Sequence, residues 1–196
     1  FQRREHVNIQ SLIPDANSFK NVFPRAFEVL KNPRETLSNI KNDQSTISSI
    51  YKNYLVALVL IGSIIGFIKN TIIGTSIPFA GTIKVPLVDG IIQFILQLIL
   101  GLAMYYIIAM IIEFLAPKFE GNANRTDAFK LVSYSATASI IASYFILIGT
   151  GIGGLISLVG LGYAIYTFWI GIPILLNIPE AKRLLFTIVT FICSFV

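Results

Sequence analysis

The run VDGIIQFILQLILGLAMYYIIAMIIEFL, residues 88–115, decides the fold class. It has no charged residue between Asp89 and Glu113, and about 20 apolar residues in a helix are enough to cross the hydrocarbon core of a bilayer. Of the 196 residues in the chain, 55% are hydrophobic and 13% are charged, whereas a soluble domain has about 25% charged residues. The sequence therefore predicts an all-α integral membrane protein.

Further apolar stretches lie on both sides of this run. They are Tyr51–Ile68, Ala128–Ile148, Gly151–Leu176 and Ala181–Val196. The last is short for a helix that must cross a bilayer. We expect a five-span transmembrane domain at residues 51–196, preceded by a polar and amphipathic arm at residues 1–50.

The positions of the basic residues indicate the orientation. If the N-terminus lies in the cytoplasm, all but two of the fifteen basic residues fall on the cytoplasmic side, and the exceptions are Lys69 and Lys84. Cytoplasmic loops of membrane proteins carry this excess of Lys and Arg. We therefore expect a cytoplasmic N-terminus and an external C-terminus.

Residues 19–40 of the arm read as two short amphipathic helices, with Pro24 as a break in the first. Asn32, Pro33 and Glu35 form a capping-box arrangement for the second. The expected apolar face of the first helix is Phe19, Phe23, Phe27 and Leu30. An aromatic face beside basic residues suits a helix at the anionic inner leaflet, and a cap packed on the bundle is the open alternative. The candidate membrane-surface contacts are Lys20, Arg25, Lys31 and Arg34.

The stretch GTGIGG, residues 149–154, matches the dinucleotide-binding pattern G-x-G-x-x-G. It follows a membrane span instead of a strand, and the next acidic residue is Glu180. A dinucleotide site needs a strand before the glycines and an acidic residue about 20 positions later. The sequence therefore predicts an outer turn between two spans and no nucleotide site.

Small residues form a stripe on each of the two helices that this turn joins. On the fourth span they are Gly153, Ser157, Gly160, Ala164, Thr167 and Gly171, and on the third span Ser135, Ser139 and Ala142. Small residues let helix backbones approach closely in lipid. We expect an antiparallel hairpin with these helix-packing residues face to face.

The residues that support catalysis or metal binding are scarce. The chain has one histidine, His6, and one cysteine, Cys193, so a histidine-activated nucleophile within the membrane and a His or Cys metal cluster are excluded. We expect no enzymatic activity, no cofactor, no metal, and no nucleic-acid or nucleotide partner.

A transport function is the alternative to a scaffold. Asp89, Gln93 and Gln97 follow one another at four-residue steps and form a possible polar path down the second span. Glu113, near the inner end of that span, is expected to pair with Lys130 or Lys118. A salt-bridge anchor at the interface and hydrogen bonds between helices are the simpler interpretations of these residues.

Three motifs in succession resemble the Yip-type (Ypt-interacting) family of polytopic membrane proteins. They are KNPRETLSNI at 31–40, FLAPKFEGNANRTDAFKLVSYSA at 114–136 and LVGLGYAIYTFWIGIPILLNIPEAKR at 158–183. The resemblance implies five spans. Eukaryotic members of the family are implicated in binding prenylated Rab GTPases and in vesicle traffic. The DLYGP-like motif of those members does not occur here, which favours a prokaryotic relative in the cytoplasmic membrane; for a eukaryotic protein the expected location is an endomembrane. We expect a scaffold or accessory subunit that contacts the lipid bilayer and associates with other integral membrane proteins or with itself.

Overall fold

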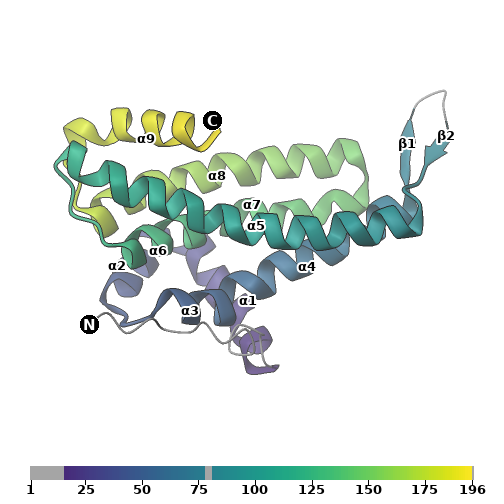
Figure 1. Ribbon diagram of the computed structural model, residues 1–196, viewed down its shortest axis with the longest axis horizontal. Coiled ribbons are helices and arrows are strands. Elements are labelled where there is room, and N and C mark those ends of the chain that lie inside the picture. Colours follow the sequence, from purple (N-terminus) through teal and green to yellow (C-terminus); the bar gives the residue numbers. More distant parts are fainter. Residues whose placement is uncertain (1–15, 78–80, 196) are drawn as a thin grey trace, which may run out of the picture.

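The computed structural model describes residues 16–77 and 81–195. Four helices in these residues are long and apolar enough to cross a membrane: Ile47–Ile73, Leu87–Phe119, Arg125–Ile148 and Gly151–Leu176. They lie side by side along the long axis of the molecule (Figure 1). The all-α, multi-pass architecture expected from the apolar runs is therefore confirmed.

The elements follow the chain in simple order. The arm contains α1 (Ala16–Lys31) and α2 (Pro33–Asn42). The first span combines α3 (Ile47–Ile50), α4 (Val56–Phe67) and π-helical stretches at Tyr51–Leu55 and Ile68–Ile73. A short antiparallel hairpin of β1 (Thr75–Ile77) and β2 (Gly81–Ile83) leads to α5 (Leu87–Leu115), which ends in a 3-10 turn at Ala116–Phe119. The rest are α6 (Arg125–Ser135), α7 (Thr137–Ser143), a 3-10 turn at Tyr144–Ile148, α8 (Thr150–Leu176) and α9 (Glu180–Phe195).

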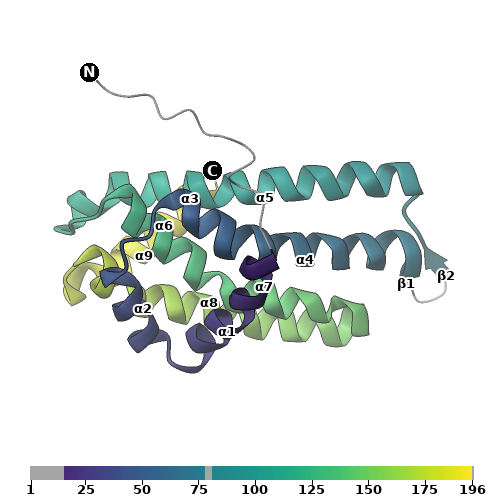
Figure 2. The same cartoon turned by 90° about the horizontal axis from the view of Figure 1, so that it is seen from below.

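The two ends of the bundle differ. One end, here called the arm end, carries α2 and the starts of α6 and α9, and the β1–β2 hairpin projects from the opposite, far end (Figures 1 and 2). The largest fully buried side chains gather toward the arm end, where α4, α6 and α8 meet the arm; they include Tyr54, Phe129, Tyr134, Ile172 and Leu175. The hydrophobic core thus forms where the arm closes the bundle.

The arm helices form over the expected residues, with two differences. Residues 16–31 make one continuous helix through Pro24, so the expected break is wrong. The residues buried against the bundle are Val22, Ala26 and Val29, whereas Phe23 and Phe27 are exposed. The smaller side chains at this i, i+4, i+7 spacing bring α1 close to the bundle and turn the aromatic rings outward.

Two of these spans form the expected antiparallel hairpin. The chain turns at Gly149, whose φ is +140°, a conformation that favours glycine. Gly160 is buried, and a Cβ atom there would meet Ala142 and would lie 2.8 Å from the carbonyl oxygen of Ala138. The backbones of α7 and α8 can approach this closely only because position 160 has no side chain.

The third span is not one straight helix. It breaks at Ala136, between α6 and α7, and its last turn is a 3-10 helix. Hydroxyl groups compete for backbone acceptors along this stretch, because Thr137, Ser139 and Ser143 each donate to the carbonyl three residues earlier at 2.6–2.8 Å. Such side-chain bonds to the preceding turn bend helices.

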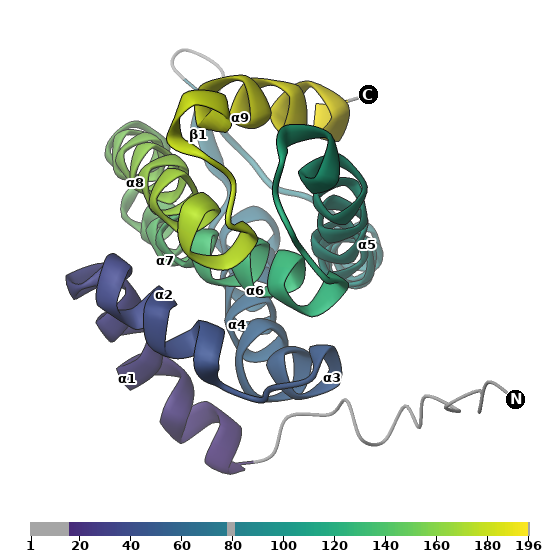
Figure 3. The ribbon, with the colours of Figure 1, turned by 90° about the vertical axis from the view of Figure 1, so that its left-hand side faces the viewer.

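The expected fifth span is not confirmed. Its residues form α9, which has sixteen residues and is about 24 Å long at 1.5 Å per residue, while the bilayer core is about 30 Å thick. Viewed along the bundle, α9 runs across from α8 to α5, whereas α4, α5 and α8 are seen end-on (Figure 3). Its polar residues Arg183, Thr187 and Thr190 are buried and Leu184, Leu185 and Ile188 are exposed. Phe186 is buried as well, so α9 packs a mixed polar and apolar face on the bundle and leaves an apolar face exposed.

We predict that Gly160→Leu destabilises the helical hairpin. A leucine side chain would overlap Ala142 and the backbone of α7, and overpacking of this kind costs about 1–3 kcal/mol. The thermal unfolding midpoint of the purified protein in mild detergent measures the effect. Gly162→Leu is the matched control, since Gly162 is exposed and a Cβ there meets nothing within 4 Å. Equal midpoints for the two variants would contradict the assigned contact.

Candidate functional site

A buried lysine ties the arm to the bundle. Lys130 on α6 is 3% exposed, and its ammonium group donates to the carbonyl oxygen of Asp43 at 2.7 Å. The carbonyl oxygen of Lys41 lies 3.5 Å away and the carboxylate of Asp127 lies 3.9 Å away. A buried ammonium group needs such acceptors because burial removes its hydration. The segment after α2 is therefore held against α6 by one charged side chain.

Two further hydrogen bonds connect the arm to α8. The hydroxyl of Tyr163 donates to the carbonyl oxygen of Leu30 at 2.5 Å. The ammonium group of Lys41 donates to the side-chain oxygen of Asn177 at 2.8 Å. Asn177 is the left-handed residue that ends α8. The arm thus packs as a cap on the bundle.

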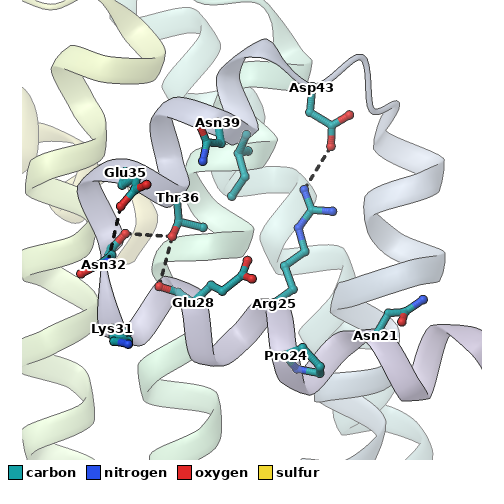
Figure 4. Close-up of a pocket in the computed structure, with 11 residues that line it drawn as sticks. Asn21, Pro24, Arg25, Glu28, Lys31, Asn32, Glu35, Thr36, Asn39 and Asp43 are labelled. Atoms are coloured by element: carbon teal, nitrogen blue, oxygen red, sulfur yellow. Dashed lines mark hydrogen bonds and ion pairs between the residues drawn. The ribbon is translucent and has the colours of Figure 1, made fainter.

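A groove of about 820 Å³ runs between α1 and α2 (Figure 4). Arg25 reaches across from α1 to the carboxylate of Asp43 at 3.1 Å, and its guanidinium group lies 5.2 Å from the centre of the Tyr134 ring. The other charged residues of the lining are Glu28, Lys31 and Glu35. The described residues of the lining, which include no histidine or cysteine, offer hydrogen bonds and charge.

The start of α2 is where the sequence places it, but the capping box does not form. The helix begins at Pro33 after Asn32, and the Asn32 side chain makes no bond to a backbone N–H. Its amide group instead donates to the carboxylate of Glu35 at 3.4 Å. The hydroxyl of Thr36 lies 2.8 Å from the carbonyl oxygen of Asn32. The pattern thus predicted the helix boundary correctly and the hydrogen bonds incorrectly.

The proposed membrane-surface residues have different surroundings. Lys20, Lys31 and Arg34 are exposed, whereas Arg25 is engaged with Asp43 and Tyr134 inside the chain. Lys31 and Arg34 line a second groove, between α2, α8 and the start of α9. His6 and the basic residues Arg3 and Arg4 lie outside the described residues.

The small-residue stripe of α8 lies against the third span of the same chain. Gly153 approaches the carbonyl oxygen of Phe145, where a Cβ would be 2.6 Å away, and Gly171 approaches Leu131 and Leu37. Ala164, Thr167 and Ser135 are buried, Ser157 and Ser139 are half-buried, and Ala142 meets Gly160. Most of this surface is covered within the chain.

The three residues of the possible polar path, Asp89, Gln93 and Gln97, are all exposed on α5. Gln97 lines a pocket of about 270 Å³ between α4, α5 and α7, together with Ser63, Ser139 and Ser143. The hydroxyl of Ser63 is buried and has no hydrogen-bond partner among the described residues.

Glu113 does not continue this path. Sixteen residues separate it from Gln97, which places it about 160° around the helix at 100° per residue. Its carboxylate accepts a hydrogen bond from Arg125 at 2.7 Å, so the expected pairing with Lys130 or Lys118 is wrong in its partner. Arg125 lies at the first turn of α6 and also reaches the hydroxyl of Tyr106 at 3.1 Å. The pair therefore joins α5 to α6 at the arm end.

Sequence reasoning missed a hollow inside the bundle. It has a volume of about 420 Å³ and is lined from α5, α6, α7, α8 and α9. The hydroxyls of Ser135 and Thr190, in its lining, are buried and have no partner among the described residues. The hollow lies where α9 covers the space between α5 and α8 (Figure 3). No local pattern signals it, since it depends on where α9 docks.

Comparison with protein families finds one match. Residues 27–196 match the Yip1 domain. The chain belongs to the Yip1 domain family. This confirms the family that the three motifs indicated, over almost the same residues. Comparison with curated proteins and with solved structures gives no match, so the family assignment rests on the domain match and on the four apolar helices of an integral membrane protein.

We predict that Lys130→Met releases the arm of this Yip1 domain protein. The change removes the ammonium group that donates to the carbonyl oxygen of Asp43. A hydrogen bond that involves a charged group contributes about 1.5–3 kcal/mol to stability. Hydrogen exchange of the backbone amides at residues 41–46 should rise by about tenfold or more. Lys118→Met is the control, because Lys118 is exposed at the same end. Unchanged protection in Lys130→Met would show that the tether is dispensable.

Proposed function

We propose that this Yip1 domain protein is a scaffold or accessory subunit that associates laterally with other integral membrane proteins through the outer flank of α5. The proposal agrees with its family and with its four apolar helices. Family membership by itself identifies no partner. The surface of α5 provides the support for lateral association.

The second span is the least buried of the four. Within its most apolar window 11% of residues are buried inside the chain, compared with 28%, 50% and 33% in the first, third and fourth spans. Figure 3 shows α5 at the edge of the bundle. An exposed apolar helix is compatible with lipid alone, so exposure is not what carries the proposal.

The proposal is supported most directly by two polar side chains on this exposed helix. Asp89 and Gln93 share the flank with the exposed residues Leu96 and Leu100. Gln93 lies six residues into α5, about 9 Å along the helix. Lipid offers an amide group no hydrogen bond, whereas a neighbouring helix does, and such bonds between helices contribute about 0.6–2 kcal/mol. A partner helix on this flank would supply the missing acceptor or donor.

We propose the outer flank of α5, instead of the small-residue stripe of α8, as the surface of lateral contact. The sequence suggested that the small-residue faces would serve for contacts with other proteins, but Gly160 and its neighbours are occupied by α7. A transport path receives less support, because Glu113 lies on the opposite side of α5 and pairs with Arg125.

We predict that photocrosslinking from α5 captures a protein. A benzophenone amino acid at Leu96 or Leu100 should yield a protein adduct in native membranes, and Gln93→Leu should reduce that adduct roughly threefold or more. The same probe at Val159, an exposed position of α8, is the matched control and should yield lipid adducts only. An adduct that is equally abundant from Val159, or that is insensitive to Gln93→Leu, would contradict the proposal.

We also propose that the arm end faces the cytoplasm. The described basic residues other than Lys69 and Lys84 belong to the arm, to the start of the first span, to the segment from the end of α5 into α6, and to the first turn of α9. This is the distribution of the positive-inside rule if these segments face the cytoplasm. With Cys193→Ser as background, Ile83→Cys in β2 should react with a membrane-impermeant maleimide in intact cells. Ser48→Cys in α3 should react only after permeabilisation. The reverse pattern would invert the orientation.

A further inference from the structure

We infer that the groove between α2, α8 and the start of α9 binds the headgroup of an anionic glycerophospholipid. This groove, here called the interface groove, has a volume of about 790 Å³. Three basic residues line it: Lys31 at the end of α1, Arg34 in α2 and Arg183 in α9. It is separate from the α5 flank, so it can exist whether or not the proposed lateral association does.

Arg183 is the central residue of the interface groove. It is 8% exposed, and its guanidinium group lies 4.8 Å from the centre of the Trp169 ring. One terminal nitrogen donates to the carboxylate of Glu180 at 2.6 Å, and its Nε atom has no acceptor among the described residues. A guanidinium has five N–H donors in a fixed fork, so the chain satisfies this group only in part. A phosphate group in the groove would provide further acceptors.

The other cations of the groove are available. Lys31 and Arg34 are exposed, and the acidic residue in the same lining is Glu35, whose carboxylate accepts from Asn32. Glu180 is outside the lining and is engaged with Arg183. The balance of charge therefore favours an anion. Arg is the side chain best suited to phosphate, because its planar fork can bind two oxygens at once.

The position of the groove favours a lipid over a free phosphate. Tyr166 and Trp169, on the last turns of α8, form its wall beside Ile170. Tyrosine and tryptophan gather at the level of the headgroups, where their rings contact acyl chains and their polar atoms contact water. Figure 3 shows α2 and the start of α9 on the two sides of α8 at the arm end. Basic pockets between helices at this depth suit phospholipid headgroups.

The test compares lipids bound to the purified full-length protein. Native mass spectrometry after exchange into mixed phosphatidylglycerol and phosphatidylcholine micelles should show retained phosphatidylglycerol. Arg34→Gln should reduce this retention about fivefold, which corresponds to the loss of one cation near a membrane surface. Arg183→Gln should reduce it further. Arg34 is exposed, so its variant reports on binding even if Arg183→Gln fails to fold.

Two controls distinguish specific binding of the lipid in the groove from general electrostatic attraction between basic residues and anionic lipid. Lys20→Gln removes the same charge from an exposed position of α1 outside the groove, and it should leave retention unchanged. Excess inorganic phosphate or glycerol phosphate should displace little of the bound lipid, since neither contacts the aromatic wall. Three results would each overturn the inference. They are an equal loss of bound phosphatidylglycerol in Arg34→Gln and Lys20→Gln, retention of phosphatidylcholine equal to that of phosphatidylglycerol, and complete displacement of the bound lipid by phosphate.

Discussion

The absence of a side chain at Gly160 brings the backbones of α7 and α8 into contact, and most of the remaining packing is arranged around this pair. A Cβ at this position would lie 2.8 Å from the carbonyl oxygen of Ala138, so the contact is backbone against backbone. Lipid tails are as apolar as the side chains they surround, and close packing therefore takes the place of the hydrophobic effect in holding these spans together. Once α7 and α8 are paired, α8 presents one side to the arm and another to α9.

The arm and α9 pack on different sides of α8 and form the walls of the interface groove. The arm is fixed by the Lys130 ammonium group and by the hydroxyl of Tyr163. Its two helices supply two cations of the interface groove, Lys31 from the end of α1 and Arg34 from α2. The other wall comes from α9, which places Arg183 over Trp169. Seen along the bundle, α9 runs from α8 towards α5, and α5 lies at the edge with much of its surface uncovered.

These features suit a protein that works by association in the plane of the membrane. Among the described residues, no group of three or more His, Cys, Asp or Glu side chains is placed to hold a metal ion. The polar groups that do lie at membrane depth, such as Gln93 and Gln97, are hydrogen-bonding residues. A lipid headgroup in the interface groove would join α2 to α8 and α9, and would thereby add to the fixing of the arm.

The sequence by itself determined the membrane class, four of the spans to within a few residues, the two arm helices, the helical hairpin and the family. The family follows from three motifs that resemble it, and the rest follows from composition, from apolar length and from the spacing of small residues, all of which are local properties of the chain. It did not determine the buried face of α1, where Val22 and Ala26 replace Phe23 and Phe27, or the partner of Glu113. Only the tertiary structure decided those contacts, the tether at Lys130, the course of α9 and the meeting of Lys31, Arg34 and Arg183. Each depends on residues far apart in the chain, and the distance between them is set by how closely the helices pack.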